Sequence, residues 1–323
     1  MNELLDKCHK AHLVVLEDFK RVCDRHGLKW FAFCGTLLGA VRHNGFIPWD
    51  DDLDICMMRS DYKLFLQYAE KEMSGYTFDT FDSYRAEENR HYDFKGITRI
   101  NNTYLANFTQ GHMEKFDFPY YAGIDLYPLD YVPADDVYEK ALSVYRYLLF
   151  TGYKYKSLNW DGYTSPKCPD VDLETAYAEI FKATGIRINP NKDVLKQLNK
   201  LAVMVATHTK KSDRVACMMH TAHYQNLIFP KNAFKTAIKT KFENTDINIP
   251  CGYDEVLRVN YGDYMQPKQC KPHEYPYYKF QERDVMRFII DNPEMSKNIP
   301  ALYIQDVYEE QRERLDQIYG GAK

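Results

Sequence analysis

The segment PWDDDLDICMM, residues 48–58, restricts the fold of this chain more than any other part of the sequence. Asp52 and Asp54 share one parity, whereas Leu53 and Ile55 share the other. Successive side chains of a β-strand point to opposite faces, so a strand here buries the apolar pair and presents the acids together, with their Cα atoms roughly 6–7 Å apart. Carboxylates this close repel each other unless a cation lies between them. The pattern therefore predicts a metal site, and oxygen ligands of this kind suit Mg²⁺ or Mn²⁺.

The same acids also have three other interpretations. A calcium-binding EF-hand loop that starts at Asp50 requires Gly five positions later, where this chain has Ile55. A solvated acidic turn does not explain why the acids alternate with apolar residues. The acidic metal motif of a nucleotide-sugar glycosyltransferase uses the same kind of acidic pair, so that class of enzyme stays open.

A candidate phosphate-binding turn precedes the acids. Residues 28–35 have the pattern of a short buried strand, and residues 36–43 have that of a two-turn helix. Gly35 and Thr36 lie at the junction, where backbone N–H groups and the helix dipole favour an anion. The hydroxyl of Thr36 adds a further polar group. This junction favours phosphoryl chemistry.

A third acid is predicted on another strand. Asp125 lies in the half-buried strand pattern of residues 122–129, and it is a candidate third metal ligand or general base. Residues 93–100 also alternate like a strand, and they carry Lys95 and Arg99. If this strand neighbours the acids, the two cations can neutralise the phosphates of a donor.

The order of the predicted elements indicates an α+β fold with a mixed sheet. A 3.6-residue periodicity predicts a helix over residues 2–26 that ends at Gly27, and a further helix, capped by Ser60, follows the acidic strand. From about residue 135 the pattern is mainly helical. We therefore expect a catalytic core with an N-terminal helix over residues 1–134, and a mainly helical substrate-binding part over residues 135–323 that packs on it.

Charge and composition exclude some partners and compartments. The chain has 42 Lys and Arg against 46 Asp and Glu, a formal charge of −4, which disfavours nonspecific nucleic-acid binding. No window approaches about 18 apolar residues, and the 8 Cys contain no C-x-x-C pair, so we expect an unexported cytoplasmic protein. Residues 138–156 are helical in pattern, aromatic and basic, which leaves open a peripheral contact with the inner membrane face.

Three segments resemble the LicD phosphotransferase family, which includes relatives of fukutin and fukutin-related protein within the wider nucleotidyltransferase superfamily. They are CGTLLGAVRHNGFIPWDDDLDI, GIDLYPLD and IPCGYDEVLRVNYGDYMQP. The resemblance implies a nucleotidyltransferase-like core in which Gly35 and Thr36 form the phosphate-contacting turn and Asp52, Asp54 and Asp125 bind the metal. Further residues that resemble the supporting residues of the family are Arg42, Trp49 and the segment from Tyr261 to Tyr264.

The resemblance also implies an activity. A CDP-linked donor, often CDP-choline, would transfer its phospho-alcohol to a hydroxyl of a cell-surface glycan or of its lipid-linked precursor, and CMP would leave. The best single expectation is phosphocholine transfer that depends on Mg²⁺ or Mn²⁺. Two alternatives remain, a glycosyltransferase that uses the same acids and a non-catalytic nucleotide-binding protein.

Overall fold

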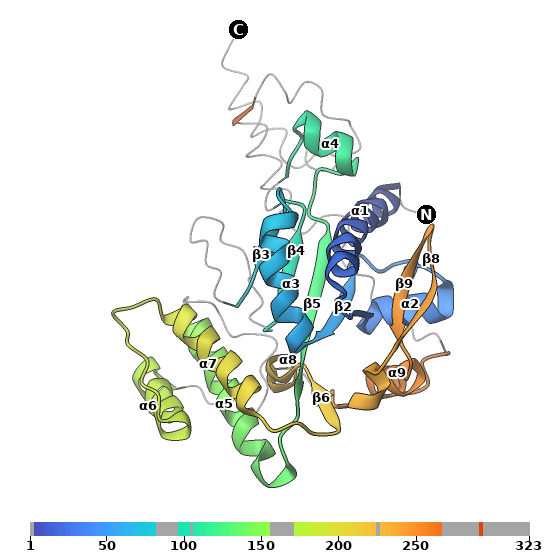
Figure 1. Ribbon diagram of the computed structural model, residues 1–323. Helices are drawn as coiled ribbons and strands as arrows, with labels where there is room; N and C mark the ends of the chain where they lie inside the picture. The colour runs from blue at the N-terminus through green and yellow to red at the C-terminus, as the bar shows by residue number, and fades with distance from the viewer. Residues whose placement is uncertain are drawn as a thin grey trace.

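The computed structural model describes residues 3–81, 96–103, 106–155, 171–223, 227–266 and 291–292 (Figure 1). The helices are α1 Glu3–His26, α2 Cys34–His43, α3 Arg59–Glu72, α4 Gln110–Phe116, α5 Asp135–Tyr155, α6 Leu173–Thr184, α7 Val194–His208, α8 Met218–His223 and α9 Tyr253–Tyr261, with a 3₁₀ turn at Lys231–Phe234. The strands are β1 Phe31–Ala32, β2 Asp54–Met58, β3 Thr77–Asp79, β4 Thr98–Asn101, β5 Gly123–Tyr131, β6 Arg214–Ala216, β7 Phe229–Pro230, β8 Ala237–Phe242 and β9 Thr245–Pro250.

The main sheet is mixed and has the order β1-β2-β5-β4-β3. Only the pairing of β2 with β5 is parallel among the strand pairs that the structure describes, and β6 and β7 extend the sheet beyond the end of β5. Strands β8 and β9 form a separate hairpin. Helices and a mixed sheet in one structure confirm the α+β prediction.

Helices α1 and α3 both contact β5 (Figure 1). The apolar residues of α1 recur at helical spacing and are buried, and the helix ends before Gly27, whose φ of 62° is the left-handed conformation that terminates helices. On α3, the hydroxyl of Tyr62 is hydrogen-bonded to Oγ1 of Thr98 at 2.5 Å. Because Thr98 pairs with Leu126 and Leu126 with Ile55, α3 covers the face to which these apolar residues point.

The second half of the chain is less uniformly helical than its pattern predicts. Helices α5 to α8 build a second apolar cluster, and Figure 1 shows α5, α6 and α7 grouped to one side of the sheet. Strands β6 to β9 and α9 instead return to the first cluster, through residues such as Phe242 and Leu257. These strands are short and are followed at once by turns, so their apolar residues give no clear period. The division at residue 134 stays a prediction, since side chains from both sides of it share the first cluster.

The helix after the acidic strand begins differently from the prediction. Helix α3 starts at Arg59 with Met58 as its N-cap, and no side chain caps it, so the predicted cap by Ser60 is wrong. The physical reason is an ion pair: Nε and Nη2 of Arg59 donate to the two carboxylate oxygens of Asp130, each at 2.7 Å. This pair fixes the first turn of α3 against the end of β5.

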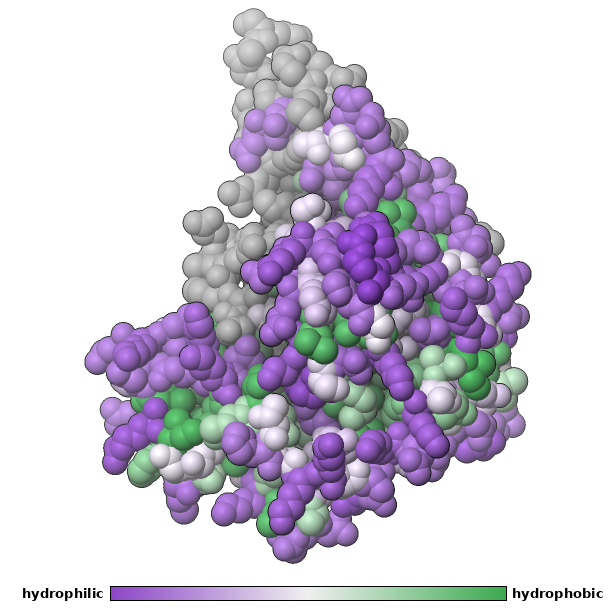
Figure 2. Space-filling view, in the orientation of Figure 1, coloured by the Kyte–Doolittle hydropathy of each residue, from purple (hydrophilic) through white to green (hydrophobic). Residues whose placement is uncertain are grey.

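One face of the predicted membrane-facing helix packs inside the protein. On α5, Tyr145 and Phe150 are buried in the fold. None of the helices within the described ranges has both the length and the apolar character that a membrane span needs. Figure 2 shows a largely hydrophilic surface on this side of the molecule, with hydrophobic residues gathered near α5, α6 and α7. A cleft of about 560 Å³ lies between these helices, and Val137 and Val205 are among the residues that line it. The peripheral membrane contact stays a prediction.

The buried ion pair between Arg59 and Asp130 predicts a large effect on stability. We expect Asp130→Asn to lower the free energy of unfolding by about 3 kcal/mol, because the Arg59 guanidinium then keeps its charge in a desolvated position without a counter-charge. Asp130 is only 3% exposed. Urea unfolding followed by circular dichroism measures the change.

The matched control is the exposed ion pair of Arg214 and Asp135. Nη2 of Arg214 lies 2.6 Å from Oδ1 of Asp135, but the side chain of Arg214 is 37% exposed and that of Asp135 is 87% exposed. Asp135→Asn should change the unfolding free energy by less than about 1 kcal/mol. Equal effects of the two substitutions would contradict the role given to the buried pair.

Candidate active site

Two acids from distant parts of the sequence lie side by side at one end of the sheet. Asp54 is the first residue of β2, and it pairs with Asp125 of β5 in the parallel ladder. Paired residues on neighbouring strands, about 4.8 Å apart, direct their side chains to the same face. The backbone of Asp54 is fixed by two hydrogen bonds: its N–H donates to Oγ1 of Thr36 at 2.7 Å, and its carbonyl accepts from the N–H of Phe33 at 3.0 Å. Both acids therefore project from rigid backbone.

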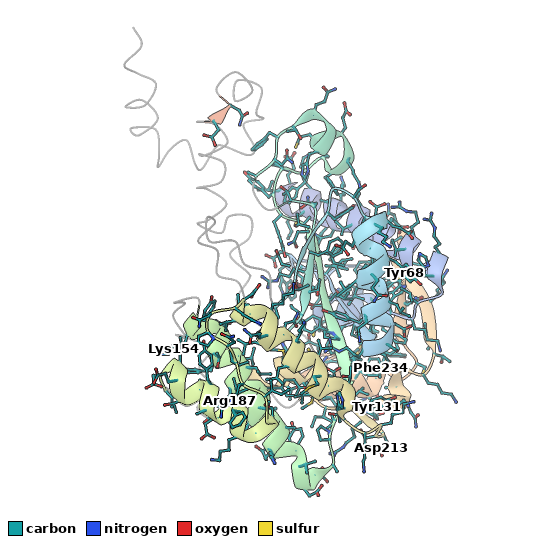
Figure 3. The ribbon with its side chains drawn as sticks, turned by 60° about the vertical axis from the view of Figure 1, so that its left-hand side comes forward. Tyr68, Tyr131, Lys154, Arg187, Asp213 and Phe234 are labelled. Carbon is teal, nitrogen blue, oxygen red and sulfur yellow. The ribbon has the colours of Figure 1, made fainter. Side chains whose placement is uncertain are left out.

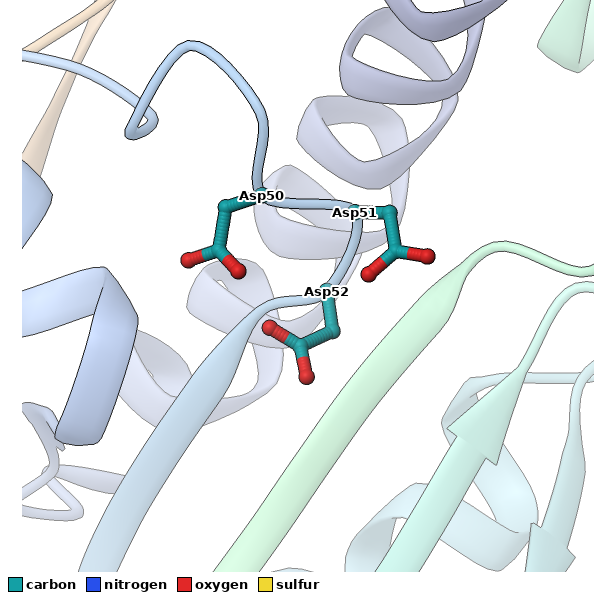
Figure 4. A group of neighbouring side chains, drawn as sticks. All are labelled: Asp50, Asp51 and Asp52. Atoms are coloured by element: carbon teal, nitrogen blue, oxygen red, sulfur yellow. The ribbon is translucent and has the colours of Figure 1, made fainter. Parts of the chain in front are cut away.

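Three further acids stand on the loop that leads into β2. Figure 4 shows Asp50, Asp51 and Asp52 on consecutive residues beside β5. One carboxylate oxygen from each lies within 4.8 Å of the others. The strand begins only at Asp54, so the prediction that Asp52 also lies in the strand is wrong. The reason is that no neighbouring strand pairs with residues 50–52 within the described part of the chain, where a turn bond from the N–H of Asp50 to the carbonyl of Ile47 bends the backbone instead.

The close spacing of these carboxylates affects the pKa of Asp54. Burial, and after it the negative charges of Asp52, Asp125 and Asp50, raise the pKa of Asp54 well above its usual value. The hydroxyl of Tyr127 donates a hydrogen bond to Asp54 and opposes this increase. A cation between the carboxylates relieves the same repulsion, and a set of carboxylate oxygens suits a hard divalent ion. The residues present therefore fit Mg²⁺ or Mn²⁺.

The start of α2 lies directly against the acidic loop. A Cβ atom at Gly35 would come within 2.5 Å of Oδ2 of Asp50, so any larger residue here would displace the Asp50 carboxylate. The preceding Cys34 has a φ of 39°, a left-handed conformation that is rare for a residue with a side chain. The N-cap residue, Phe33, makes no side-chain hydrogen bond to the helix. Amide groups of the first turn thus lie beside the acids, where they can bind an anion that a metal also holds.

The other predicted residues differ in their distance from the acids. Tyr261, the last residue of α9, is close enough that the charges of the acids, in addition to burial, raise its pKa. Arg42 contacts the segment that follows α9, since its Nη1 donates to the carbonyl of Tyr264 at 3.0 Å. Trp49 is 40% exposed in the loop before the acids. Lys95 lies outside the described residues. The roles expected for these residues, and for the hydroxyl of Thr36, stay predictions.

His9 of α1 supports the acidic loop, and the sequence analysis identified neither this residue nor the buried His12 one turn further along the helix. Nε2 of His9 donates to the carbonyl of Asp50 at 2.7 Å, and the imidazole stacks on Phe46 with ring centroids 4.1 Å apart. Burial lowers the pKa of His9, which favours the neutral ring. Burial also lowers the pKa of His12 to about 4, and its Nδ1 donates to the carbonyl of Cys8 at 2.9 Å. An amphipathic helix pattern contains no signal for such contacts with a distant loop.

Arg99 is the cation that directly contacts one of the acids. It lies on β4 opposite Asp125. Its Nε donates to Oδ1 of Asp125 at 3.1 Å, and its Nη2 donates to Oδ2 at 3.5 Å. The register of the sheet therefore places Asp54, Asp125 and Arg99 in one row across three neighbouring strands.

Comparisons with known proteins relate the segment that carries these residues to one family. Residues 27–138 match the family described as LicD/FKTN/FKRP, nucleotidyltransferase domain. A lipopolysaccharide cholinephosphotransferase LicD of Haemophilus influenzae is 27% identical over 278 residues, which cover 81% of this chain and 92% of that protein. An uncharacterized protein of Rickettsia prowazekii is 31% identical over 117 residues, 36% of this chain and 43% of that protein. The expected resemblance to the LicD family is confirmed, and the acids, α2 and Arg99 all fall within the matched residues.

The contact of His9 with the acidic loop predicts an effect on metal binding. We expect His9→Phe, which keeps the ring stack but removes the hydrogen bond to the carbonyl of Asp50, to weaken Mn²⁺ binding about tenfold, because the loop that carries the acids loses a support. Titration of free Mn²⁺ by electron paramagnetic resonance measures the affinity without any substrate.

Another histidine of α1 supplies a matched control. His26 stacks on Tyr68 with centroids 3.6 Å apart and is hydrogen-bonded to Oε1 of Glu72 at 2.6 Å, away from the acids. His26→Phe should leave the Mn²⁺ affinity unchanged. If His9→Phe also leaves it unchanged, His9 does not position the loop for metal binding.

Proposed function

We propose that this chain, of which residues 27–138 match the LicD family, transfers phosphocholine from a CDP-activated donor to a hydroxyl of a cell-surface glycan or of its lipid-linked precursor, with CMP as the leaving group. The observation that carries the proposal is the placement of Asp54 beside Asp125, under the first turn of α2. The relative of Haemophilus influenzae bears a name that states phosphocholine transfer to lipopolysaccharide. That name supports a glycan acceptor for this chain as well.

The metal site of this proposal consists of Asp52, Asp54 and Asp125. A bound Mg²⁺ or Mn²⁺ would neutralise charge on the donor phosphates and stabilise the charge that develops as CMP leaves. Asp52 and Asp54, which lie two positions apart on one segment, would bind the cation together. Asp125 offers two oxygens from the neighbouring strand, so one of them can bind the cation while the other accepts the proton of the acceptor hydroxyl.

The donor site is proposed at the start of α2. The first amide groups of this helix, near Gly35, donate hydrogen bonds to the diphosphate of the donor, and the helix dipole favours its negative charge. Tyr261 closes the site from the side of α9, and the exposed ring of Trp49 is available to stack on the base or to contact the choline group. A cytoplasmic location and contact with a membrane surface belong to this proposal, since a lipid-linked acceptor is presented at a membrane.

The identity of the products tests the reaction. Phosphorus NMR of a mixture of the protein, CDP-choline, Mg²⁺ and a lipopolysaccharide acceptor should show CMP and a new phosphodiester. Release of a nucleoside diphosphate from a nucleotide sugar would instead support a glycosyltransferase. Binding of CDP-choline without any turnover would support a nucleotide-binding protein without catalysis.

The proposed metal ligands predict a loss of rate without a loss of fold. We expect Asp54→Asn, and likewise Asp52→Asn, to lower kcat for CMP release by at least about 100-fold, because the transition state loses several kcal/mol of stabilisation through the metal. EDTA should abolish the rate, and added Mg²⁺ or Mn²⁺ should restore it. The melting temperature of metal-free Asp54→Asn should equal or exceed that of the wild type, since the substitution removes repulsion among the acids.

An exposed acid at the other end of the sheet is the control for charge removal. Asp213 precedes β6, and Figure 3 shows it near Tyr131, the last residue of β5. Asp213→Asn should keep wild-type kcat. Wild-type turnover in purified, folded Asp54→Asn would overturn the assignment of the metal site.

A further inference from the structure

The ion pair of Arg99 occupies both oxygens of Asp125. Nε reaches Oδ1 at 3.1 Å and Nη2 reaches Oδ2 at 3.5 Å, so the guanidinium lies along the whole carboxylate. The side chain of Asp125 is 12% exposed, and that of Arg99 is 30% exposed. In this arrangement Arg99 supplies positive charge to a face that carries several carboxylates.

This arrangement is incompatible with the roles proposed for Asp125. A divalent cation and a guanidinium repel each other, and they compete for the same carboxylate oxygens. Acceptance of a proton from a hydroxyl also requires an oxygen that is not already covered by a donor group. Loading of the site with metal and substrate therefore favours release of Asp125 by Arg99.

The donor provides the next partner for the released side chain. Arg99 projects from β4 on the same face as Asp125 and Asp54, and it is exposed enough to change its conformation without unpacking the core. A planar guanidinium binds two oxygens of a phosphate as well as it binds a carboxylate. The diphosphate of the donor, held by a metal between the acids, would lie within reach of this long side chain.

We propose that Arg99 binds the donor diphosphate, and that its ion pair with Asp125 is the resting arrangement of the metal-free enzyme. The arriving divalent cation takes the place of the guanidinium at Asp125, and Arg99 moves to a phosphate oxygen of the donor. This inference rests on the proposed function, since it assigns the partner of Arg99 within the same site. Arg99 then has opposite effects on the binding of two ligands: it weakens the binding of the metal and strengthens the binding of the donor.

Binding measurements on Arg99→Gln separate these two effects. Without nucleotide, Mn²⁺ binding followed by electron paramagnetic resonance should tighten at least about fivefold, because the competitor for Asp125 is gone. With saturating Mn²⁺, the affinity for CDP-choline measured by calorimetry should weaken about tenfold or more, because a charge-assisted contact with phosphate is lost. Arg99→Lys keeps the positive charge but loses the planar guanidinium that binds two oxygens at once. This variant should bind Mn²⁺ like the wild type and should bind CDP-choline with intermediate affinity.

A second arginine on the same sheet controls for the substitution itself. Arg214 of β6 pairs with Asp135 at the other end of β5 from Asp125, and Arg214→Gln should change neither affinity. Circular dichroism and thermal melts establish that each variant is folded.

Two outcomes overturn the proposal, and one separates it from the proposed reaction. Weaker or unchanged Mn²⁺ binding in folded Arg99→Gln would mean that Arg99 merely supports Asp125. Unchanged affinity for CDP-choline would mean that Arg99 does not bind the donor. If Mn²⁺ binding tightens and CDP-choline binding weakens while the wild type releases no CMP, the role of Arg99 stands and the proposed reaction fails.

Discussion

Mutual repulsion among carboxylates is the constraint around which this protein is organised. Asp50, Asp51 and Asp52 share one short loop, and Asp54 lies beside Asp125 on paired strands. Such a cluster is unfavourable in a metal-free protein, as the raised pKa of Asp54 indicates. The fold tolerates it because the surrounding backbone is held by hydrogen bonds and by a rigid apolar layer. A divalent cation in the proposed site would relieve this repulsion.

The supports of the cluster come from parts of the chain that are far apart in sequence. Helix α1 contributes His9 to the carbonyl of Asp50, and α2 contributes the hydroxyl of Thr36 to the amide of Asp54. Gly35 permits the close approach of α2 to the loop. Arg99, from β4, contacts Asp125. An acid whose backbone is held in place loses less entropy when it binds an ion, so these supports would favour the proposed metal.

The sequence predicted local features of this site better than its assembly. The alternation around Leu53 and Ile55 identified the strand, and the helical period of residues 36–43 identified α2. The register that places Asp54 opposite Asp125 was out of reach, because a strand pattern reveals which residues share a face and not which strands are neighbours. The sequence also contains no signal for the hydrogen bond from His9 to the carbonyl of Asp50, because that contact forms only when α1 packs on the acidic loop. Strands β6 and β7 were missed because two- to three-residue strands are too short for a reliable period, and β8 was missed because most of its side chains are exposed.

The parallel pairing of β2 with β5 has a consequence for how the protein folds. The chain must pass through α3, β3, β4 and α4 before β5 can lie beside β2, so contacts between Asp54 and Asp125 close a long loop. Such non-local pairings form late and slowly, because the chain loses the entropy of the closed loop before any contact compensates it. The unfolded chain presents the acidic loop without its partner strand. Folding therefore depends first on the apolar layer under α1 and α3, and the proposed metal site is assembled only when β5 joins β2.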